Sequence, residues 1–372
     1  MTDELAAFSD VGEVVRVHRP EIPVMCMHRS TFEESAAAFV AKFDGTVLYA
    51  VKANPHPLVV NAIFDGGVRH VDAASIGEIE YVAKLRPDAV ISFNNPVKPA
   101  HAIRRAYRDF GVRDFVIDHP AELDKVRDET GPDITVQVRV GRRNAAAVID
   151  LNTKFGTTIK EASRLIVEIL RMEATPAVSF HVGWQAQDPE AYTRILQRIV
   201  SMPNAGELAY INVGGGFPSV LMPPGLTLDD YFAAVSGMSI PLRAEPGSAL
   251  AASGASLLTR VLLRKERAVY LNDGIYGTLN EHAHYPGPGP HMVLDSMGRP
   301  RFGRETEVTV FGPTCDSLDV LPNRYSVPDS TQTGDWILFS QAGAYSNALV
   351  TNFNHLGEID VVEVLTAPTV AR

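Results

Sequence analysis

Short apolar runs alternate with segments of helical spacing over most of the first 250 residues. The runs predicted as strands are Thr46–Val51, Val68–Ala73, Ala89–Phe93, Phe115–Ile117, Ile134–Val140, Ala177–Val182, Ala209–Val213 and Ser239–Ala244. The predicted helices between them include Ser75–Leu85, Pro99–Phe110, Ala121–Glu129, Ile159–Arg171 and Pro189–Val200. Strands and helices alternating in this number predict an α/β fold with a (β/α)8 TIM-type barrel. A doubly wound open sheet is the alternative.

The pattern changes after about residue 250, where the loops become rich in Gly and Pro and no helical spacing stands out. Strand-like segments there are Leu257–Leu263, Ala268–Leu271, Glu307–Phe311 and Trp336–Phe339. We therefore expect a C-terminal β-barrel or β-sandwich domain after the first barrel. Near the N-terminus, Ile22–Cys26 is strand-like, and Phe32–Phe43 has helical spacing with Thr31 as its expected N-cap.

The strand predicted over Thr46–Val51 ends at a lysine, Lys52, and Asn54-Pro55 then breaks the strand into a loop. In a barrel of parallel strands, catalytic residues collect at the C-terminal ends of the strands. A partly desolvated amine at that position can be neutral enough to form a Schiff base. The alternative is a lysine that ends a strand in solvent.

Composition narrows the choice of partner and compartment. The chain has 372 residues, enough for a barrel and a second, smaller domain. Its net charge of −10 argues against a nucleic-acid or anionic-membrane partner. The two cysteines, Cys26 and Cys315, are too few for a disulfide framework. The N-terminus is acidic and no apolar run is long enough to span a membrane, so we expect a cytoplasmic protein.

The segment Tyr49-Ala50-Val51-Lys52-Ala53-Asn54 resembles the cofactor-lysine signature of the fold type III pyridoxal-phosphate enzymes, which include alanine racemase and the ornithine and diaminopimelate decarboxylases. The resemblance implies that pyridoxal 5′-phosphate is the cofactor and that Lys52 forms a Schiff base with it. It also implies a pyridoxal-binding barrel over residues 27–250. Residues 1–26 and 251–372 would form the β domain, which completes the active site at a homodimer interface.

Further segments resemble the family's cofactor-binding motifs in family order. Asp72 begins Asp-Ala-Ala-Ser-Ile-Gly-Glu and is expected close to the lysine. Arg139, an arginine inside an apolar strand and upstream of Lys154-Phe155-Gly156, needs an anionic partner and is expected beneath the cofactor ring. His181, in His-Val-Gly-Trp, is expected to stack on that ring. Each of these side chains also has a purely structural interpretation, as a helix cap or a satisfied core residue.

The phosphate and the ring nitrogen have their own candidate residues. Three glycines after an apolar strand leave backbone N–H groups free to surround an anion. A carboxylate beside the ring nitrogen keeps that nitrogen protonated. The resemblance assigns the phosphate to the turn Gly214, Gly215 and Gly216, and the ring nitrogen to Glu245. Further cofactor-binding residues that it implies are Gly247 and Ser248, which follow in Glu-Pro-Gly-Ser, and Tyr345, the phosphate-binding tyrosine.

Three positions depart from the family pattern. Trp184 and Ser248 stand where the family usually has a serine and an arginine that hold the phosphate, and His355 stands where glycine is usual. Arg243 precedes Glu245 by two residues and so shares its strand face, which makes Arg243 a candidate replacement for the missing arginine.

Two segments resemble the family's substrate-binding motifs. Asn272-Asp273-Gly274-Ile275-Tyr276-Gly277 is expected to contribute Asp273 and Tyr276. Gly312-Pro313-Thr314-Cys315-Asp316 is expected to enter the other subunit's active site, where Cys315 favours protonation of the product and Asp316 meets the distal amine. Two carboxylates of like charge would repel without a cation between them, so Asp273 and Asp316 favour a diamino acid.

Together the motifs predict a PLP-dependent α-decarboxylase that converts L-ornithine to putrescine or, as second choice, L-lysine to cadaverine. In that reaction Lys52, Cys315, Glu245 and His181 are the expected catalytic residues. The alternatives are an amino-acid racemase, a non-catalytic regulator related to ornithine decarboxylase, and a decarboxylase of another amine-bearing acid. We expect no metal site, because Glu281-His282-Ala283-His284 lacks a third suitable ligand in its loop.

Overall fold

A computed structural model describes residues 5–141 and 147–369 of the chain. The chain divides into two compact units, and each is considered by itself. The barrel unit comprises Ala36–Lys52 and Ile63–Ala249. The sheet unit comprises Met1–Ser35, Ala53–Ala62 and Leu250–Arg372.

In the described part of the barrel unit, eight parallel strands close into a barrel in the order β11-β12-β3-β4-β5-β6-β7-β9. These are β3 (Thr46–Ala50), β4 (His70–Ala73), β5 (Val90–Phe93), β6 (Asp114–Ile117), β7 (Thr135–Val140), β9 (Thr175–Phe180), β11 (Ile211–Asn212) and β12 (Leu242–Ala244). Each overlaps one of the predicted strands, so the predicted barrel is confirmed and the open sheet is wrong. A short antiparallel pair, β8 (Ala147–Ile149) and β10 (Trp184–Ala186), lies outside the barrel.

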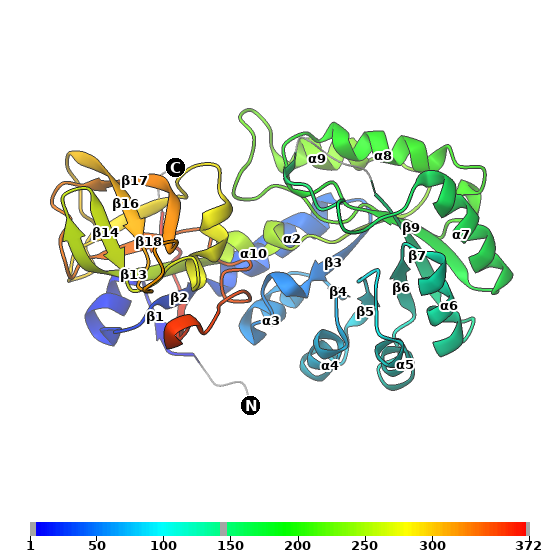
Figure 1. The fold of residues 1–372 in the computed structure, drawn as a ribbon, viewed down its shortest axis with the longest axis horizontal. Helices are drawn as coiled ribbons and strands as arrows, with labels where there is room; N and C mark the ends of the chain where they lie inside the picture. Colours follow the sequence, from blue (N-terminus) through cyan, green and yellow to red (C-terminus); the bar gives the residue numbers. More distant parts are fainter. Residues whose placement is uncertain (1–4, 142–146, 370–372) are drawn as a thin grey trace. The chain divides into compact units, whose positions relative to one another are not determined.

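Helices surround the barrel strands (Figure 1). They are α4 (Ile76–Leu85), α5 (Ala100–Asp109), α6 (Pro120–Glu129), α7 (Ile159–Arg171), α8 (Glu190–Val200), α9 (Leu228–Val235) and the short η3 (Ala205–Glu207). Helix α7 illustrates why they form: Ala162, Leu165, Ile166 and Ile169 are buried on one face, and the Thr158 side chain caps the N-terminus. At α4 the expected cap Ser75 accepts from the N–H of Glu78.

Helix α2 (Arg29–Lys42) begins earlier than the sequence predicts. The N–H groups of Thr31 and Phe32 both donate to the carbonyl of His28, so the first turn has already formed at the expected cap. Thr31 is therefore a first-turn residue, and its prediction as N-cap is wrong. Helix α3 (Pro57–Asp65) follows the loop after Lys52.

The sheet unit holds nine strands among its described residues, in the order β1-β19-β2-β13-β14-β16-β17, with β18 pairing β13 and β15. Strand β2 (Val24–Met27) lies between β13 (Ala255–Lys265) and β19 (Asp360–Val364). The other strands are β1 (Ala7–Phe8), β14 (Ala268–Leu271), β15 (His291–Leu294), β16 (Glu305–Phe311), β17 (Val320–Pro328) and β18 (Trp336–Phe339).

The core of the sheet unit is built from residues far apart in the sequence. Phe8, Val24, Leu258, Trp336 and Val362 belong to one buried apolar cluster. Short helical segments complete the unit, namely α1 (Val11–Glu13), η1 (Val14–His18), η4 (Ala252–Gly254), η5 (Thr278–His284) and η6 (Phe353–His355). Among the helices that the structure describes, none is long and apolar enough to cross a membrane.

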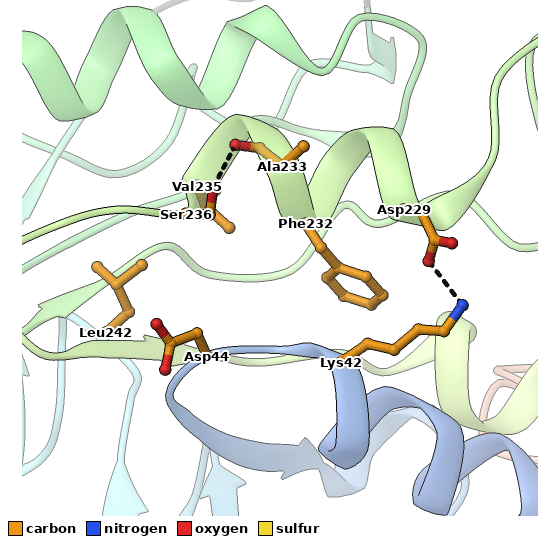
Figure 2. Close-up of a pocket in the computed structure, with 8 residues that line it drawn as sticks. All are labelled: Lys42, Asp44, Asp229, Phe232, Ala233, Val235, Ser236 and Leu242. Atoms are coloured by element: carbon orange, nitrogen blue, oxygen red, sulfur yellow. Dashed lines mark hydrogen bonds and ion pairs between the residues drawn. The ribbon is translucent and has the colours of Figure 1, made fainter.

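A cavity of about 360 Å³ opens on the barrel unit between the end of α2 and α9 (Figure 2). Lys42 and Asp229 form an ion pair of 2.7 Å at its edge, and Phe232 and Leu242 are among the apolar side chains that line it. Leu242 is the first residue of β12, so the cavity lies at the N-terminal end of that strand. Lys52 and Glu245 follow the C-terminal ends of their strands. The cavity is therefore separate from the predicted site.

Candidate active site

Lys52 lies in the single turn η2 (Val51–Ala53), which directly follows β3. Its Nζ lies 2.9 Å from Oδ2 of Asp72, which is 1% exposed on the neighbouring strand β4. The strand register pairs Ala50 with Asp72, which explains why the next turn brings the lysine to the carboxylate. The structure thus brings these two predicted residues together at the C-terminal end of the barrel.

Glu245 follows β12 at the same end of the barrel. Its Oε1 accepts hydrogen bonds from Nδ2 of Asn94 and Nδ2 of Asn212, each at 2.5 Å. Loss of water around the carboxyl raises its pKa to about 7, and the nearby charge of Asp72 adds to this. Neither asparagine was predicted, because an uncharged amide in a loop or at a strand end carries no recognisable motif.

Arg139 lies on β7 and His181 follows β9. Desolvation lowers the pKa of Arg139, while the carboxylates of Glu245, Asp118 and Asp72 act in the opposite direction. Its Nε is buried and has no hydrogen-bond partner among the described residues. Desolvation, and then the charge of Arg139, lowers the pKa of His181 to about 3, so its imidazole is neutral at physiological pH.

The glycine-rich turn follows β11 and packs against the same strands. Gly214 has φ +72° and Gly216 has φ +95°. A Cβ at Gly214 would collide with the carbonyl of Phe180, and one at Gly215 would lie 3.1 Å from Nε2 of His181. In the described structure, the N–H groups of Gly215 and Gly216 donate to no protein acceptor. The turn therefore offers free backbone donors that suit an anion.

Arg243 does not lie where it would replace a phosphate-binding arginine. Its guanidinium pairs with Asp114 and lies 3.6 Å from the ring centroid of Tyr210, inside the barrel. Residues 243 and 245 share a strand face, but Arg243 lies one step deeper along β12. The prediction that it compensates for Ser248 is therefore wrong. Ser248 itself begins the short helix α10 (Ser248–Ala251) and is 9% exposed.

Within the sheet unit, the two segments that were predicted to bind substrate come together with a third segment around Phe353. The Tyr276 hydroxyl donates to Oδ2 of Asp316 at 2.5 Å, and this bond lowers the pKa of Asp316. The rings of Tyr276 and Phe353 lie 4.9 Å apart. Cys315 is exposed, and its N–H donates to Oδ1 of Asn354 at 3.1 Å. Cys315 and Asp316 thus lie on one surface of this unit.

Asp273 has a different environment from the one predicted. It is 3% exposed, and its carboxylate accepts from the N–H of Gly274 at 2.8 Å and from the N–H and hydroxyl of Thr278. Burial raises its pKa to about 6. These local bonds fix the start of η5 and engage the carboxylate, and its role in substrate binding stays a prediction.

Glu281 on η5 was missed as a candidate ligand for a substrate amine. Its side chain is 7% exposed, and burial alone raises its pKa to about 7. It has no hydrogen-bond or ion-pair partner among the residues that the structure describes. Its only sequence signal is an acidic residue in a predicted loop, in the segment Glu281-His282-Ala283-His284. Over the described ranges, no group of three His, Cys, Asp or Glu side chains could hold a metal ion.

Tyr345 lies in the sheet unit in a left-handed backbone conformation with φ 62°. Its N–H donates to the carbonyl of Ala53 at 2.6 Å. Nearby, the Asn54 side chain donates to the carbonyl of Gly343 at 2.9 Å. The residues that directly follow Lys52 are therefore held by the segment that carries Tyr345.

Comparison with known proteins identifies the family. Residues 29–252 match the model of the pyridoxal-dependent decarboxylase, pyridoxal binding domain. The chain belongs to the pyridoxal-dependent decarboxylases. The lysine/ornithine decarboxylase of Selenomonas ruminantium is 32% identical over 83% of this chain and 80% of its own length. Antizyme inhibitor 2 of Xenopus laevis is also 32% identical, over 95% of this chain and 80% of its own length.

The same family relationship is evident in three dimensions. The crystal structure of the arginine decarboxylase of Paramecium bursaria Chlorella virus bound to agmatine superimposes with a TM-score of 0.83. It is 26% identical, and the match covers 95% of this decarboxylase and 99% of the viral chain. The match extends over both units of the fold.

Pyridoxal phosphate is the cofactor of this decarboxylase, and the described residues fit it. The Lys52 amine, the unpartnered Nε of Arg139 and the Glu245 carboxylate are found at the same end of the barrel. The free N–H groups of the glycine turn suit a phosphate. Trp184 and Ser248 supply no positive charge, so a phosphate bound here would rely more on backbone donors than the usual family pattern implies.

Proposed function

We propose that this decarboxylase removes the α-carboxylate of a basic L-amino acid, L-ornithine first and L-lysine second, to give putrescine or cadaverine. One observation carries the choice of substrate. The segments 272–285 and 312–319 contain four carboxylates and neither lysine nor arginine. One of these carboxylates, Glu281, is buried and has no partner among the residues that the structure describes. A buried carboxylate is stabilised in its ionised form by a cation, which a distal ammonium group supplies.

Each residue of the barrel unit has a proposed task. Lys52 holds the cofactor covalently, and Asp72 orients the lysine amine. Neutral His181 packs on the cofactor ring without adding a charge. Arg139 compensates the charge of nearby carboxylates. The phosphate is held by Gly214, Gly215, Gly216, Gly247 and Ser248, together with Tyr345 of the sheet unit. Bound pyridoxal phosphate accepts the electron pair left by the departing carboxylate. Glu245 strengthens this ability by keeping the ring nitrogen protonated.

We further propose a homodimer in which Cys315 and Asp316 of one copy complete the site of the other. Exposed apolar side chains occur on the segments around these residues, with Leu318 68%, Leu349 55% and Leu356 44% exposed. Apolar side chains exposed this close together are typical of a protein interface. In the dimer, Cys315 donates the proton to Cα, and Asp316, whose pKa is lowered by Tyr276, meets the distal amine as an anion.

A substrate panel tests this proposal. Ornithine, lysine, arginine and diaminopimelate are incubated with the cofactor-loaded protein, and the amine products are quantified. The expected order of kcat/KM is ornithine, then lysine, with no product from diaminopimelate, whose second carboxylate would need a cation. Preference for diaminopimelate would contradict the proposal.

One substitution tests the carboxylate directly. Glu281→Gln keeps the side-chain size but removes the charge, so KM for ornithine should rise at least about tenfold. Glu358→Gln, an exposed glutamate of the same unit, is the matched control and should leave KM unchanged. Equal KM values for both variants would exclude Glu281 from substrate binding.

A non-catalytic regulator of the ornithine decarboxylase type is the second candidate, and the departures at Trp184, Ser248 and His355 favour it. Such a protein would return every amino acid of the panel unchanged and would still bind a protein partner. A decarboxylase of another amine-bearing acid would also leave the panel unchanged, because its substrate lies outside it, so binding of a protein partner separates the two candidates.

A further inference from the structure

Three amide side chains form a network in the barrel interior beneath Glu245. Gln137 on β7 and Asn212 on β11 are fully buried, and Asn94 follows β5. Nε2 of Gln137 donates to Oδ1 of Asn94 at 2.9 Å, and Oε1 of Gln137 accepts from Nδ2 of Asn212 at 3.0 Å. Both asparagines then donate to the same oxygen, Oε1, of Glu245. Gln137 therefore contacts both residues that hold the carboxylate.

Asp114 on β6 determines the direction of these hydrogen bonds. Its Oδ1 accepts from Nε2 of Gln137 at 2.7 Å, while its Oδ2 accepts from the Tyr210 hydroxyl at 2.6 Å and from Arg243. An ionised carboxylate accepts hydrogen bonds only. The NH₂ group of Gln137 must therefore face Asp114, which makes Asn94 present its oxygen to Gln137 and its NH₂ group to Glu245.

The two oxygens of Glu245 have different environments. Two neutral donors occupy Oε1 and stabilise the carboxylate in its ionised form, because an amide N–H stays a donor and takes up no proton. Oε2 receives no hydrogen bond from the described residues. The network thus leaves one oxygen of a fixed, charged carboxylate available to a ring nitrogen.

Asn212 also connects this network to the phosphate end of the site. Its Oδ1 accepts from the N–H of Gly214 at 3.0 Å, at the start of the glycine turn. The side chain is 0% exposed, so no water competes for these bonds. One asparagine thus fixes both the Glu245 carboxylate and the backbone that begins the phosphate-binding turn.

We propose that Gln137 is a positioning residue that, through Asn94 and Asn212, holds Glu245 ionised and directs its Oε2 to the cofactor ring nitrogen. This inference rests on the proposed role of Glu245. When the network is intact, the proton between Oε2 and the ring nitrogen stays on the nitrogen. When the donors to Oε1 are lost, the carboxylate becomes more basic, and that proton moves toward Oε2.

Other charged groups near Glu245 also shift its pKa. Asp72 raises its pKa, whereas Lys52 and Arg139 lower it. Beyond these, the ionisable groups that contact the network or the adjacent turn are Asp114, Tyr210, Arg243 and His181. Substitution of an uncharged residue, Gln137, changes the network without removing any of these charges.

The experiment uses holoenzyme loaded with pyridoxal phosphate labelled with ¹⁵N in its ring. The ¹⁵N chemical shift reports protonation of the ring nitrogen and is followed from pH 6 to pH 9 in wild-type protein, Gln137→Leu, Asn94→Ala and Glu245→Gln. We expect a protonated nitrogen in the wild type throughout. Glu245→Gln should give the shift of a neutral ring, and both network variants should give intermediate shifts that move further toward neutral as pH rises.

Kinetics supply a second readout. In Gln137→Leu, Asn94 and Asn212 lose their hydrogen bonds to residue 137, and their bonds to Glu245 become weaker. We therefore expect kcat to fall about tenfold and KM for the substrate to stay within about twofold of the wild-type value. Ser92→Ala is the matched control, because Ser92 is a buried barrel residue of β5 with no bond to Glu245. It should retain the wild-type shift and kcat. Asn94→Ala, which changes a loop residue, provides the test if Gln137→Leu does not fold.

The outcomes separate this inference from the proposed function. If Glu245→Gln leaves the ¹⁵N shift at its wild-type value, Glu245 does not protonate the ring and the proposed function loses that step. If Glu245→Gln shifts the signal and Asn94→Ala and Gln137→Leu match the wild type, the inference is overturned and the role of Glu245 stands.

Discussion

At the scale of single residues, burial explains the unusual acids of this decarboxylase. Glu281, Asp273 and Glu245 all have raised pKa values, and desolvation is the first cause in each. They differ in their partners. Thr278 and Gly274 donate to Asp273, and Asn94 and Asn212 donate to one oxygen of Glu245, but Glu281 has no partner in the described structure. This difference identifies Glu281 as the acid that is available to bind a cation.

The raised pKa of Glu281 predicts a pH dependence of stability. Because the folded pKa rises from 4.5 to about 7, its neutral form is favoured, and folding loses stability as pH rises through this window. The loss attributable to this residue is roughly 3 kcal/mol. Urea unfolding at pH 5 and pH 8 should therefore show a smaller pH difference for Glu281→Gln than for the wild type. An unchanged difference, with Glu358→Gln as control, would contradict the burial argument.

The site residues show which contacts a sequence can predict. The Lys52 segment and the glycine turn are contiguous motifs, and the structure places Lys52 beside Asp72 because their strands are neighbours. The amides of Gln137 and Asn212 come from two strands and that of Asn94 from the loop after a third, and none carries a motif, so the sequence alone does not reveal them. The bond from Thr278 to Asp273 was not predictable, because Thr278 reaches the carboxylate only after the chain turns into η5.

At the scale of elements, the barrel strands were predictable because each is a short apolar run ended by a polar or glycine-rich loop. The structure confirms all eight in the closed barrel. Helix α3 was not predicted, because Val59, Val60, Ala62, Ile63 and Phe64 are all buried and leave almost no polar face. Strand β17 was also missed, since proline and asparagine interrupt its apolar pattern.

The glycine turn gives a prediction with a matched control. Gly214 and Gly237 have φ +72° and φ +73°, but only at Gly214 would a Cβ meet backbone atoms. Gly214→Ala should weaken binding of pyridoxal phosphate at least about tenfold, because the turn must move to relieve the collision. Gly237→Ala carries the same conformational strain in open space and should bind normally. Fluorescence titration of both apoproteins measures the difference, and equal dissociation constants would contradict a phosphate site at this turn.

At the scale of the whole molecule, the account requires two copies of the chain. Lys52 and Asp316 belong to different compact units, and we propose that each site takes Lys52 from one copy and Asp316 from the other. Lys52→Ala and Asp316→Ala should each be inactive alone. Mixed under conditions of subunit exchange, they should recover roughly a quarter of wild-type activity, because half of the dimers are hybrids with one intact site. No recovery, despite hybrid dimers detected by mass spectrometry, would show that the sites are not shared.

The central claim is that Lys52 carries the cofactor. Borohydride reduction of the cofactor-loaded protein, followed by peptide mass mapping, tests it most directly. We expect a pyridoxyl-phosphate mass added to the peptide that contains Lys52, and no label in Lys52→Ala. A label on another lysine, or an unmodified Lys52 in protein that has bound the cofactor, would contradict it.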